Sequence, residues 1–210
     1  MNKKEDVKEI AAIARGRSLI YLWLSGFFLE KPSNEMFSRL SNRDILNFLD
    51  GVFQGSENYD KVKEFLLNKD VDSIKKEFDL LFNESSDLYV SPYAHEYYGK
   101  EMLGLVKAFY NSLGLEVDLR GLKAEDHIGL ELAIMASLCE LEAEELERER
   151  VADAAIIQEG ERMFLTDHLT KWVGDFARAV EEKRPDSFYA SLAQLTNELI
   201  DLDLSLFKES

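Results

Sequence analysis

The amino-acid sequence predicts an all-α protein with a single multi-helix domain, for three reasons. Apolar residues recur at helical spacing along most of the chain. No useful length of sequence alternates apolar and polar residues as a half-buried strand does. The three prolines, Pro32, Pro92 and Pro185, all fall between helical patterns. We therefore expect roughly nine or ten helices within residues 1–210.

The first part of the chain is predicted to hold one long helix followed by shorter ones. The long helix covers about residues 5–29 and ends before Pro32, because proline cannot continue a helix. The shorter helices are expected at residues 35–40, 43–53, 59–67 and 71–82. The last of these repeats apolar residues at helical spacing, namely Ile74, Phe78, Leu81 and Phe82. Polar turn formers favour a loop at residues 83–92.

The middle of the chain is predicted to contain two helices joined by a hinge. Residues 94–112 are expected to be helical and to stop near Gly114. A loop follows at residues 115–124, and we expect segment 113–124 to be a hinge between two halves of the domain. The next helix is long and starts with Asp126 as its N-cap. Its buried stripe is predicted to be Ile128, Leu132, Met135 and Cys139.

The last part of the chain alternates a polar stretch with apolar helices. Segment 140–150 is polar nearly all round and is expected to be mostly a solvated face, with Glu144 and Arg148 paired four residues apart. The helix after it ends before Pro185, and Asp186 is expected to cap a final helix. The apolar residues of these two helices are Leu165, Leu169, Trp172, Phe176 and Val180, then Phe188, Leu192, Leu195 and Leu199.

The composition argues against several classes of protein. Asp and Glu number 41 against 25 Lys and Arg, so the net charge is −16, unlike that of nucleic-acid binders. This charge suits a basic partner, and it equally suits a role in solubility alone. The longest apolar run, residues 19–29, is too short to cross a bilayer, which takes about 20 residues. The first residues show no secretory signal, and Cys139 is the only cysteine, so no internal disulfide can form. We expect a cytoplasmic protein.

A small polar cluster stands at the start of the predicted long helix. His127 and Glu131 are four residues apart and share a helical face, with Asp126 beside them. The cluster suits an acid–base pair, part of a metal site, or a cap that pins a loop through charged hydrogen bonds. An adjacent carboxylate would favour the charged form of His127 near cellular pH. A metal site usually needs three or more protein ligands, so we expect no metal and no cofactor.

No residue is predicted to be catalytic. The chain has no GxSxG motif, and Cys139 falls inside an apolar helical pattern where packing is the expected role. Aromatic residues are instead dense around the first loop: Phe78, Phe82, Tyr89, Tyr93, Tyr97 and Tyr98. Aromatics at helical spacing usually belong to a core, as Phe78 and Phe82 do in this pattern. Tyrosines beside a proline on a loop are suited to hold a peptide.

A series of motifs runs from about Phe78 onward. They are Leu81-Phe82 before the loop, Pro92-Tyr93 with Tyr97 and Gly99 (PYxxxYxG), the segment 109–115 (FYNSLGL), the segment 126–132 (DHIGLEL) and the segment 164–172 (FLTDHLTKW). In this order they resemble the TorD/DmsD family of cytoplasmic redox-enzyme maturation chaperones, whose relatives include NarJ. The chain departs from the family pattern at Asn83, Ala94, His95 and Ile134.

The resemblance implies an all-helical, non-catalytic chaperone. Such proteins bind the N-terminal twin-arginine signal peptide of a molybdopterin-containing oxidoreductase and hold the apo-subunit until its cofactor is inserted, before export. By the same resemblance, the residues that bind the client are Phe82, Tyr93, Asp126, His127 and Glu131. Carboxylates would engage guanidinium groups, and the aromatic side chains would take the apolar part of the peptide.

Two other functions stay open at this point. One is a helical metal-dependent hydrolase that uses His127, Glu131 and His168. The other is a helical scaffold or regulatory protein with no signal-peptide role. The sequence does not identify the client oxidoreductase, does not decide whether a nucleotide binds, and does not separate a monomer from a dimer or a domain-swapped form.

Overall fold

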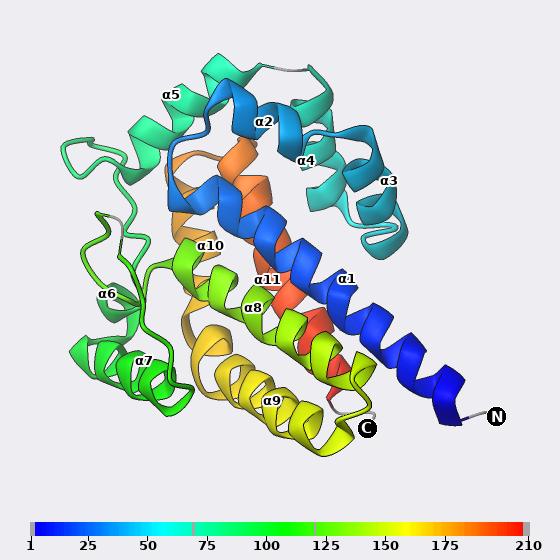
Figure 1. The fold of residues 1–210 in the computed structure, drawn as a ribbon. Helices are drawn as coiled ribbons and strands as arrows, with labels where there is room; N and C mark the ends of the chain where they lie inside the picture. Colours follow the sequence, from blue (N-terminus) through cyan, green and yellow to red (C-terminus); the bar gives the residue numbers. More distant parts are fainter. Residues whose placement is uncertain (1–2, 69, 120, 208–210) are drawn as a thin grey trace.

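The computed structural model describes residues 3–68, 70–119 and 121–207, with side chains from residue 7 onward (Figure 1). The chain is all-α in these ranges and contains no strand. Its one β-type feature there is an isolated antiparallel bridge between Tyr93 and His127. The predicted fold class is confirmed. No helix in the described part is long and apolar enough to cross a membrane.

The helices follow the sequence prediction closely in the first half. They are α1 (Lys3–Leu29), α2 (Asn34–Leu40), α3 (Arg43–Val52), α4 (Glu57–Asn68), α5 (Val71–Phe82), α6 (His95–Tyr98), α7 (Lys100–Ser112), α8 (Ile128–Glu147), α9 (Val151–Phe164), the π-helical turn η1 (Leu165–Leu169), α10 (Thr170–Lys183) and α11 (Phe188–Leu206). Because α9, η1 and α10 continue without a break, the described residues form ten continuous helical segments, within the expected number.

The long helices α1 and α8 lie side by side and antiparallel, with α10 and α11 behind them (Figure 1). Their close approach depends on Gly129, since a Cβ there would lie 2.7 Å from the backbone nitrogen of Leu29. The hydroxyl of Ser25 donates a hydrogen bond of 2.8 Å to the carbonyl of Gly129 at the same crossing. This contact fixes the start of α8 against the end of α1, where the candidate site lies.

Two predicted helix caps are wrong by one residue. His127, rather than Asp126, caps α8, because its Nδ1 accepts a hydrogen bond of 3.1 Å from the backbone of Gly129. Ser187, rather than Asp186, caps α11, and its hydroxyl accepts from the backbone of Ala190 at 3.2 Å. Asp186 instead adopts a left-handed backbone conformation with φ of 54°.

The predicted helix over residues 94–112 is broken in the structure. It divides into the short α6 and the longer α7 at Gly99, whose φ is 89°. This conformation is one that glycine adopts without the steric penalty of a Cβ. The break turns α7 away from the direction of α6, and the loop at residues 83–92 is present as predicted.

The expectation of a mostly solvated face over residues 140–150 is confirmed, with three buried residues as exceptions. Helix α8 continues to Glu147, and Glu142, Ala143 and Leu146 are buried. Periodicity misses this face because Glu142 is held by a buried arginine far away in sequence. The predicted pair of Glu144 and Arg148 does form, at 2.7 Å. The predicted apolar stripe of α8 is buried at every position: Ile128, Leu132, Met135 and Cys139.

Candidate functional site

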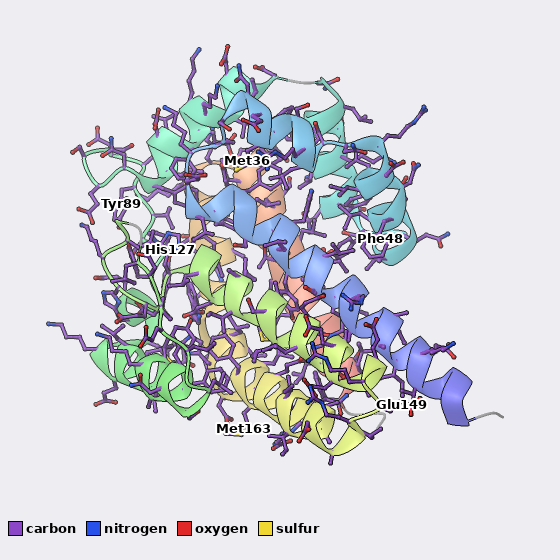
Figure 2. The ribbon with its side chains drawn as sticks, in the orientation of Figure 1. Met36, Phe48, Tyr89, His127, Glu149 and Met163 are labelled. Carbon is purple, nitrogen blue, oxygen red and sulfur yellow. The ribbon has the colours of Figure 1, made fainter. Side chains whose placement is uncertain are left out.

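A pocket of about 380 Å³ lies where the end of α1, the end of α5 and the loop before α8 meet. Three of the five predicted client-binding residues line it, namely Phe82, Tyr93 and His127. The other lining residues are Phe28, Leu29, Phe78, Asn83, Glu84, Ser85, Tyr89, Pro92, Leu122 and Lys123. Figure 2 labels Tyr89 and His127, which lie on the same side of the molecule. We call this hollow the α1–α5 pocket.

Backbone hydrogen bonds join two of the sequence motifs at the edge of this pocket. The backbone nitrogen of Ala94 donates to the carbonyl of Asp126 at 3.0 Å, and that of Ile128 donates to the carbonyl of Pro92 at 2.9 Å. The ring of Tyr93 meets the ring of His127 edge-on, with 5.1 Å between their centroids. The PY and DH motifs, distant in sequence, therefore form one wall of the pocket.

Tyr93 also ties the wall to the loop before α8. Its hydroxyl accepts a hydrogen bond of 3.0 Å from the backbone nitrogen of Lys123. The ammonium group of Lys123 forms an ion pair with Glu84 across the mouth of the pocket. Both of these charged side chains are more than half exposed, at 61% and 52%, so water reaches the pair. The pair links the loop of residues 83–92 to the segment before α8.

Phe82 belongs to an aromatic group that continues from the pocket into the core. Its ring lies 5.1 Å from that of Phe78 and 5.2 Å from that of Tyr189, centroid to centroid, with Phe28 and Phe176 further out. Phe82 is half-buried and packs against the main core. Phe78 and Phe82 therefore pack against the core, as the sequence pattern predicted, and they also line the pocket.

His127 is neutral in this environment. Burial lowers the pKa of its imidazole to about 4, and its Nδ1 acts as the acceptor that caps α8. The expectation that a neighbouring carboxylate keeps His127 charged is wrong. Asp126 turns away from it and binds His95 instead, so no compensating charge reaches the imidazole.

Asp126 is fully buried and connects α6 to the start of α8. Its Oδ2 accepts a hydrogen bond from the backbone nitrogen of His95 at 2.7 Å and lies 2.7 Å from Nδ1 of the same residue. Its Oδ1 is buried and has no hydrogen-bond partner. The side chain thus holds the PY segment in place and does not reach the surface of the pocket.

Glu131 is also fully buried, and it takes partners from the last sequence motif. One oxygen lies 2.6 Å from Nε2 of His168, and the other accepts a hydrogen bond of 3.1 Å from the indole nitrogen of Trp172. Burial raises the pKa of the Glu131 carboxyl. His168 and Trp172 are four residues apart in the last motif, and this spacing, which puts both on one helical face, was the available signal.

His127, Glu131 and His168 do not gather around one point. His127 binds the backbone of Gly129, whereas Glu131 and His168 bind each other and Trp172. Across the described ranges, no group of three or more His, Cys, Asp or Glu side chains is arranged to hold a metal ion. The arrangement predicted for a metal-dependent hydrolase is therefore absent from this part of the chain.

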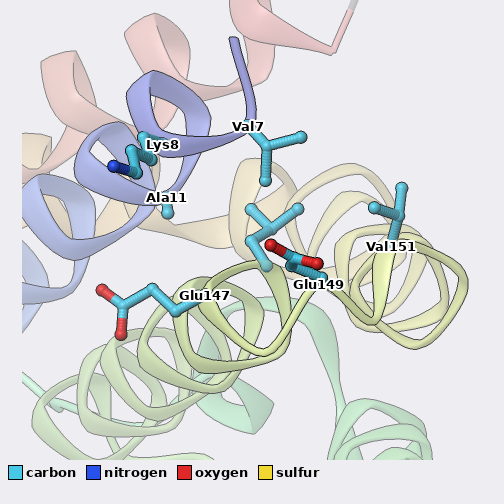
Figure 3. A pocket seen from close by; sticks show the side chains of 7 residues that line it. Val7, Lys8, Ala11, Glu147, Glu149 and Val151 are labelled. Atoms are coloured by element: carbon cyan, nitrogen blue, oxygen red, sulfur yellow. The ribbon is translucent and has the colours of Figure 1, made fainter. Parts of the chain in front are cut away.

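A second hollow of about 520 Å³ lies between the start of α1 and the turn that joins α8 to α9 (Figure 3). Val7 and Ala11 line it from α1, and Glu149 and Val151 face them from the turn and from α9. None of the five predicted residues lines this hollow, so the α1–α5 pocket is the stronger candidate site.

The fold and the site together define a class of protein. The described residues form an all-α domain with an aromatic pocket, and next to it Asp126 is bonded to His95 and Glu131 to His168. A concave, largely aromatic pocket of this kind is typical of a site that binds a ligand.

Comparison with known proteins gives the family. Residues 54–178 match the sequence model of the family described as nitrate reductase delta subunit, and the chain belongs to this family. The resemblance to the TorD/DmsD family of maturation chaperones is thereby confirmed. The protein belongs to a family of chaperones and not of enzymes.

Curated relatives match along nearly the whole chain. The chain is 25% identical over 215 residues to the chaperone protein TorD of Vibrio parahaemolyticus serotype O3:K6 (strain RIMD 2210633), covering 94% of this chain and 97% of the relative. It is 25% identical over 213 residues to the chaperone protein TorD of Aeromonas salmonicida (strain A449), covering 96% of this chain and 97% of the relative. No solved structure matches the chain.

Proposed function

We propose that the protein is a chaperone for a molybdoenzyme subunit and binds its twin-arginine signal peptide at the α1–α5 pocket, before cofactor insertion and export. The observation that carries the proposal is that Phe82, Tyr93 and His127, taken from separate family motifs, line one pocket. The pocket falls within the range of about 300–1,000 Å³ that is usual for ligand sites. We place this activity in the cytoplasm, in a monomer or a homodimer.

The wall of the pocket suits the apolar part of such a peptide. Phe28, Phe78 and Phe82 line it from α1 and α5, and Tyr89 and Tyr93 line it from the segment between α5 and α6. Tyrosine combines an apolar ring with a polar tip, so it can contact an apolar side chain while its hydroxyl stays hydrogen-bonded. Tyr93 is already bonded in this way to the backbone of Lys123.

The rim of the pocket suits the arginines. Glu84 lies at the mouth and pairs with Lys123, and exposed ion pairs of this kind contribute little to stability. An incoming guanidinium can bind a carboxylate through two parallel hydrogen bonds, whereas an ammonium group binds as a point charge. An arginine of the client would therefore displace Lys123 from Glu84.

Asp126 and Glu131 take a different part in this proposal. Both carboxylates are fully buried and bonded to other side chains, so a direct contact with the client requires the loops to open. We propose that they position the pocket wall, Asp126 through His95 and Glu131 through His168. A hinge at residues 113–124 stays a prediction, and opening there would expose the carboxylate of Asp126 first, because Asp126 lies two residues after the segment and Glu131 lies inside α8.

The test is titration calorimetry with the signal peptides of molybdoenzymes from the same host. We expect dissociation constants of about 1 μM or tighter, which is about −8 kcal/mol. The variant Glu84→Gln should weaken binding of the natural peptide, and much less that of a peptide with both arginines replaced by lysine. Glu35→Gln is the matched control, because Glu35 pairs with Arg39 within α2, does not line the pocket and loses the same charge.

A negative result is also well defined. If neither the peptides nor the intact apo-subunit give heat, the signal-peptide role is wrong. The protein would then be purified from its host together with its bound partners. Partners other than a molybdoenzyme subunit would support a scaffold role. If the peptides bind equally well to wild type and Glu84→Gln, the peptide role stands but the assigned rim is wrong.

A further inference from the structure

Arg17, in the middle of α1, is buried and meets a carboxylate from each of three other helices. Its Nε and Nη2 donate to Asp203 of α11 at 2.5 and 2.9 Å. Its Nη1 donates to Glu142 of α8 at 3.0 Å, and its Nη2 donates to Glu161 of α9 at 2.6 Å. We call these four residues the Arg17 junction. It joins α1, α8, α9 and α11 at one point and lies outside the α1–α5 pocket.

The junction contains more negative charge than positive charge. Arg17 is 8% exposed, and Glu142, Glu161 and Asp203 are at most 2% exposed. One guanidinium faces three carboxylates, so full ionisation would leave a net charge of −2 out of contact with water. Uncompensated charge is expensive to bury, and a buried group commonly takes up a proton instead.

The other groups that face the three carboxylates carry no positive charge. From α1, the hydroxyl of Tyr21 donates to Asp203 at 2.7 Å, and from α9 the amide of Gln158 donates to Glu142 at 3.2 Å. From α8, the thiol of Cys139 is buried beside the junction, and its pKa is raised by burial. From α11 and its end, the ring of Phe207 lies 5.3 Å from the guanidinium carbon. Within the described residues, Arg17 is the one cation that binds these three carboxylates.

The three carboxylates are not equally satisfied. Asp203 receives two bonds from Arg17 and one from Tyr21, and Glu142 receives one from Arg17 and one from Gln158. Glu161 receives a bond at Oε2, while its buried Oε1 has no partner. A proton on Oε1 would supply the missing hydrogen-bond function, so the geometry selects Glu161 as the group that carries it.

We propose that the Arg17 junction holds one proton at neutral pH, carried by Glu161 next to Glu142, and that its loss in mildly alkaline solution loosens α9 from α1 and α11. The pKa shifts of the two glutamates agree with this geometry. Burial, reinforced by the charge of Glu142, raises the pKa of Glu161 to about 8, and burial also raises that of Glu142. Deprotonation adds a second uncompensated negative charge at the contact of four helices, and moving α9 outward lets water reach it.

The sign of the effect on stability follows from linkage. The folded protein binds this proton more tightly than the unfolded chain, so the stabilisation is present at low pH and is lost as the pH rises through about 8. Glu161→Gln keeps the size of the side chain, removes the charge and places an amide donor at the same point. Its stability should therefore depend less on pH in the range below about 8, where wild type loses this stabilisation.

The experiment is urea unfolding of the full chain at a series of pH values from about 6 to 9. For one proton, the folding constant of wild type should fall relative to Glu161→Gln by up to about tenfold per pH unit below the pKa of about 8, and the difference should level off above it. Glu159→Gln is the matched control, because Glu159 lies on the same helix, is exposed and pairs with Arg162, and its profile should parallel wild type. Hydrogen exchange should show α9 losing protection with pH in wild type more than in Glu161→Gln.

Two results would overturn the proposal. One is a pH profile of Glu161→Gln that is parallel to wild type. The other is a Glu161→Gln protein that is less stable at every pH, which would mean that Glu161 is an ionised partner of Arg17. Infrared spectroscopy gives a direct readout, because wild type at neutral pH should show a protonated-carboxyl band that Glu161→Gln lacks. If Glu161→Gln does not fold, the same band in wild type, and its loss as the pH passes about 8, decides the question.

Discussion

The carboxylate of Glu131 lies 2.6 Å from Nε2 of His168, although the two residues are 37 positions apart in the sequence. The contact joins the start of α8 to the π-helical turn between α9 and α10. Both residues belong to family motifs, and both are buried. These motifs are therefore connected by a structural bond inside the domain, which separates the role of Glu131 from that of the residues exposed in the pocket.

We expect Glu131→Ala to destabilise the protein more than it weakens peptide binding. The change leaves His168 and the indole nitrogen of Trp172 buried without an acceptor, at about 2–4 kcal/mol in the free energy of unfolding. Chemical denaturation and peptide titration on the same preparation measure the two effects. Ser137→Ala, at an exposed position of α8, is the control and should change neither. A stable Glu131→Ala protein that loses peptide binding would place Glu131 in direct contact with the client.

Replacement of His127 should separate capping from peptide contact. His127→Ala removes the acceptor for the backbone of Gly129 and should lower stability by about 1 kcal/mol. His127→Asn keeps a side chain that is favoured at the N-cap and should retain stability, while it removes the ring that lines the pocket. If the pocket binds the peptide, both variants should show weaker binding in calorimetry. Unchanged affinity in both would limit His127 to a structural role.

The same residue gives a prediction in acid. The pKa of His127 is lowered from 6.5 to about 4, so the unfolded chain binds this proton more tightly than the folded protein does. Its contribution to stability is present above the unfolded value and is lost as the pH falls through about 4. Unfolding measured over this range should show a smaller acid-induced loss in His127→Asn than in wild type. Equal losses would show that the imidazole is already charged in the folded state.

Gly129→Ala should weaken the crossing of α1 and α8. Its Cβ would lie 2.7 Å from the backbone nitrogen of Leu29, so the helices must move apart, at about 1–3 kcal/mol. Gly104→Ala is the matched control, because no atom lies within 4 Å of its Cβ position on α7. That change should stabilise the protein by about 0.5–1 kcal/mol, since alanine favours a helix over glycine. Thermal melting distinguishes the two, and a Gly129→Ala protein that melts like wild type would contradict the close approach.

Removal of Lys123 should tighten peptide binding if the proposed exchange at Glu84 is correct. Lys123→Ala frees the carboxylate of Glu84 and leaves the backbone bond to Tyr93 in place. We expect a gain of several-fold in affinity for the twin-arginine peptide at low salt, where surface charges are screened least. Lys63→Ala, which frees Asp50 beside the distant α4, removes the same charge and should give a smaller gain. Equal gains would reduce the effect to net charge alone.

The sequence predicted most of the helices because their signals are local. The stripe of α8 from Ile128 to Cys139 follows from spacing alone, and each of its residues is buried. The Arg17 junction shows the opposite case. Its carboxylates lie 125, 144 and 186 positions away from Arg17, and no local pattern marks such partners.

The candidate site was predicted in part for the same reason. Motif order selected residues from separate segments, and three of them, Phe82, Tyr93 and His127, line one pocket. The burial of Asp126 and Glu131 depends on His95 and His168, whose positions follow from tertiary packing. The cap of α8 was misplaced because Asp126 and His127 are both polar and adjacent, and the choice between them is made by the contact with His95.

The hydrogen bonds between the segments at Pro92 and Asp126 have a consequence for the chain between them. The chain that carries α6 and α7 starts and ends at the same place, because Ala94 bonds to Asp126 and Pro92 to Ile128. The entropic cost of closing a loop at its base grows only slowly with the length of the loop. The chain between these points can therefore be lengthened in its loop at residues 113–124 at a small cost in entropy, while its base and the buried Met102, Val106 and Tyr110 stay in place.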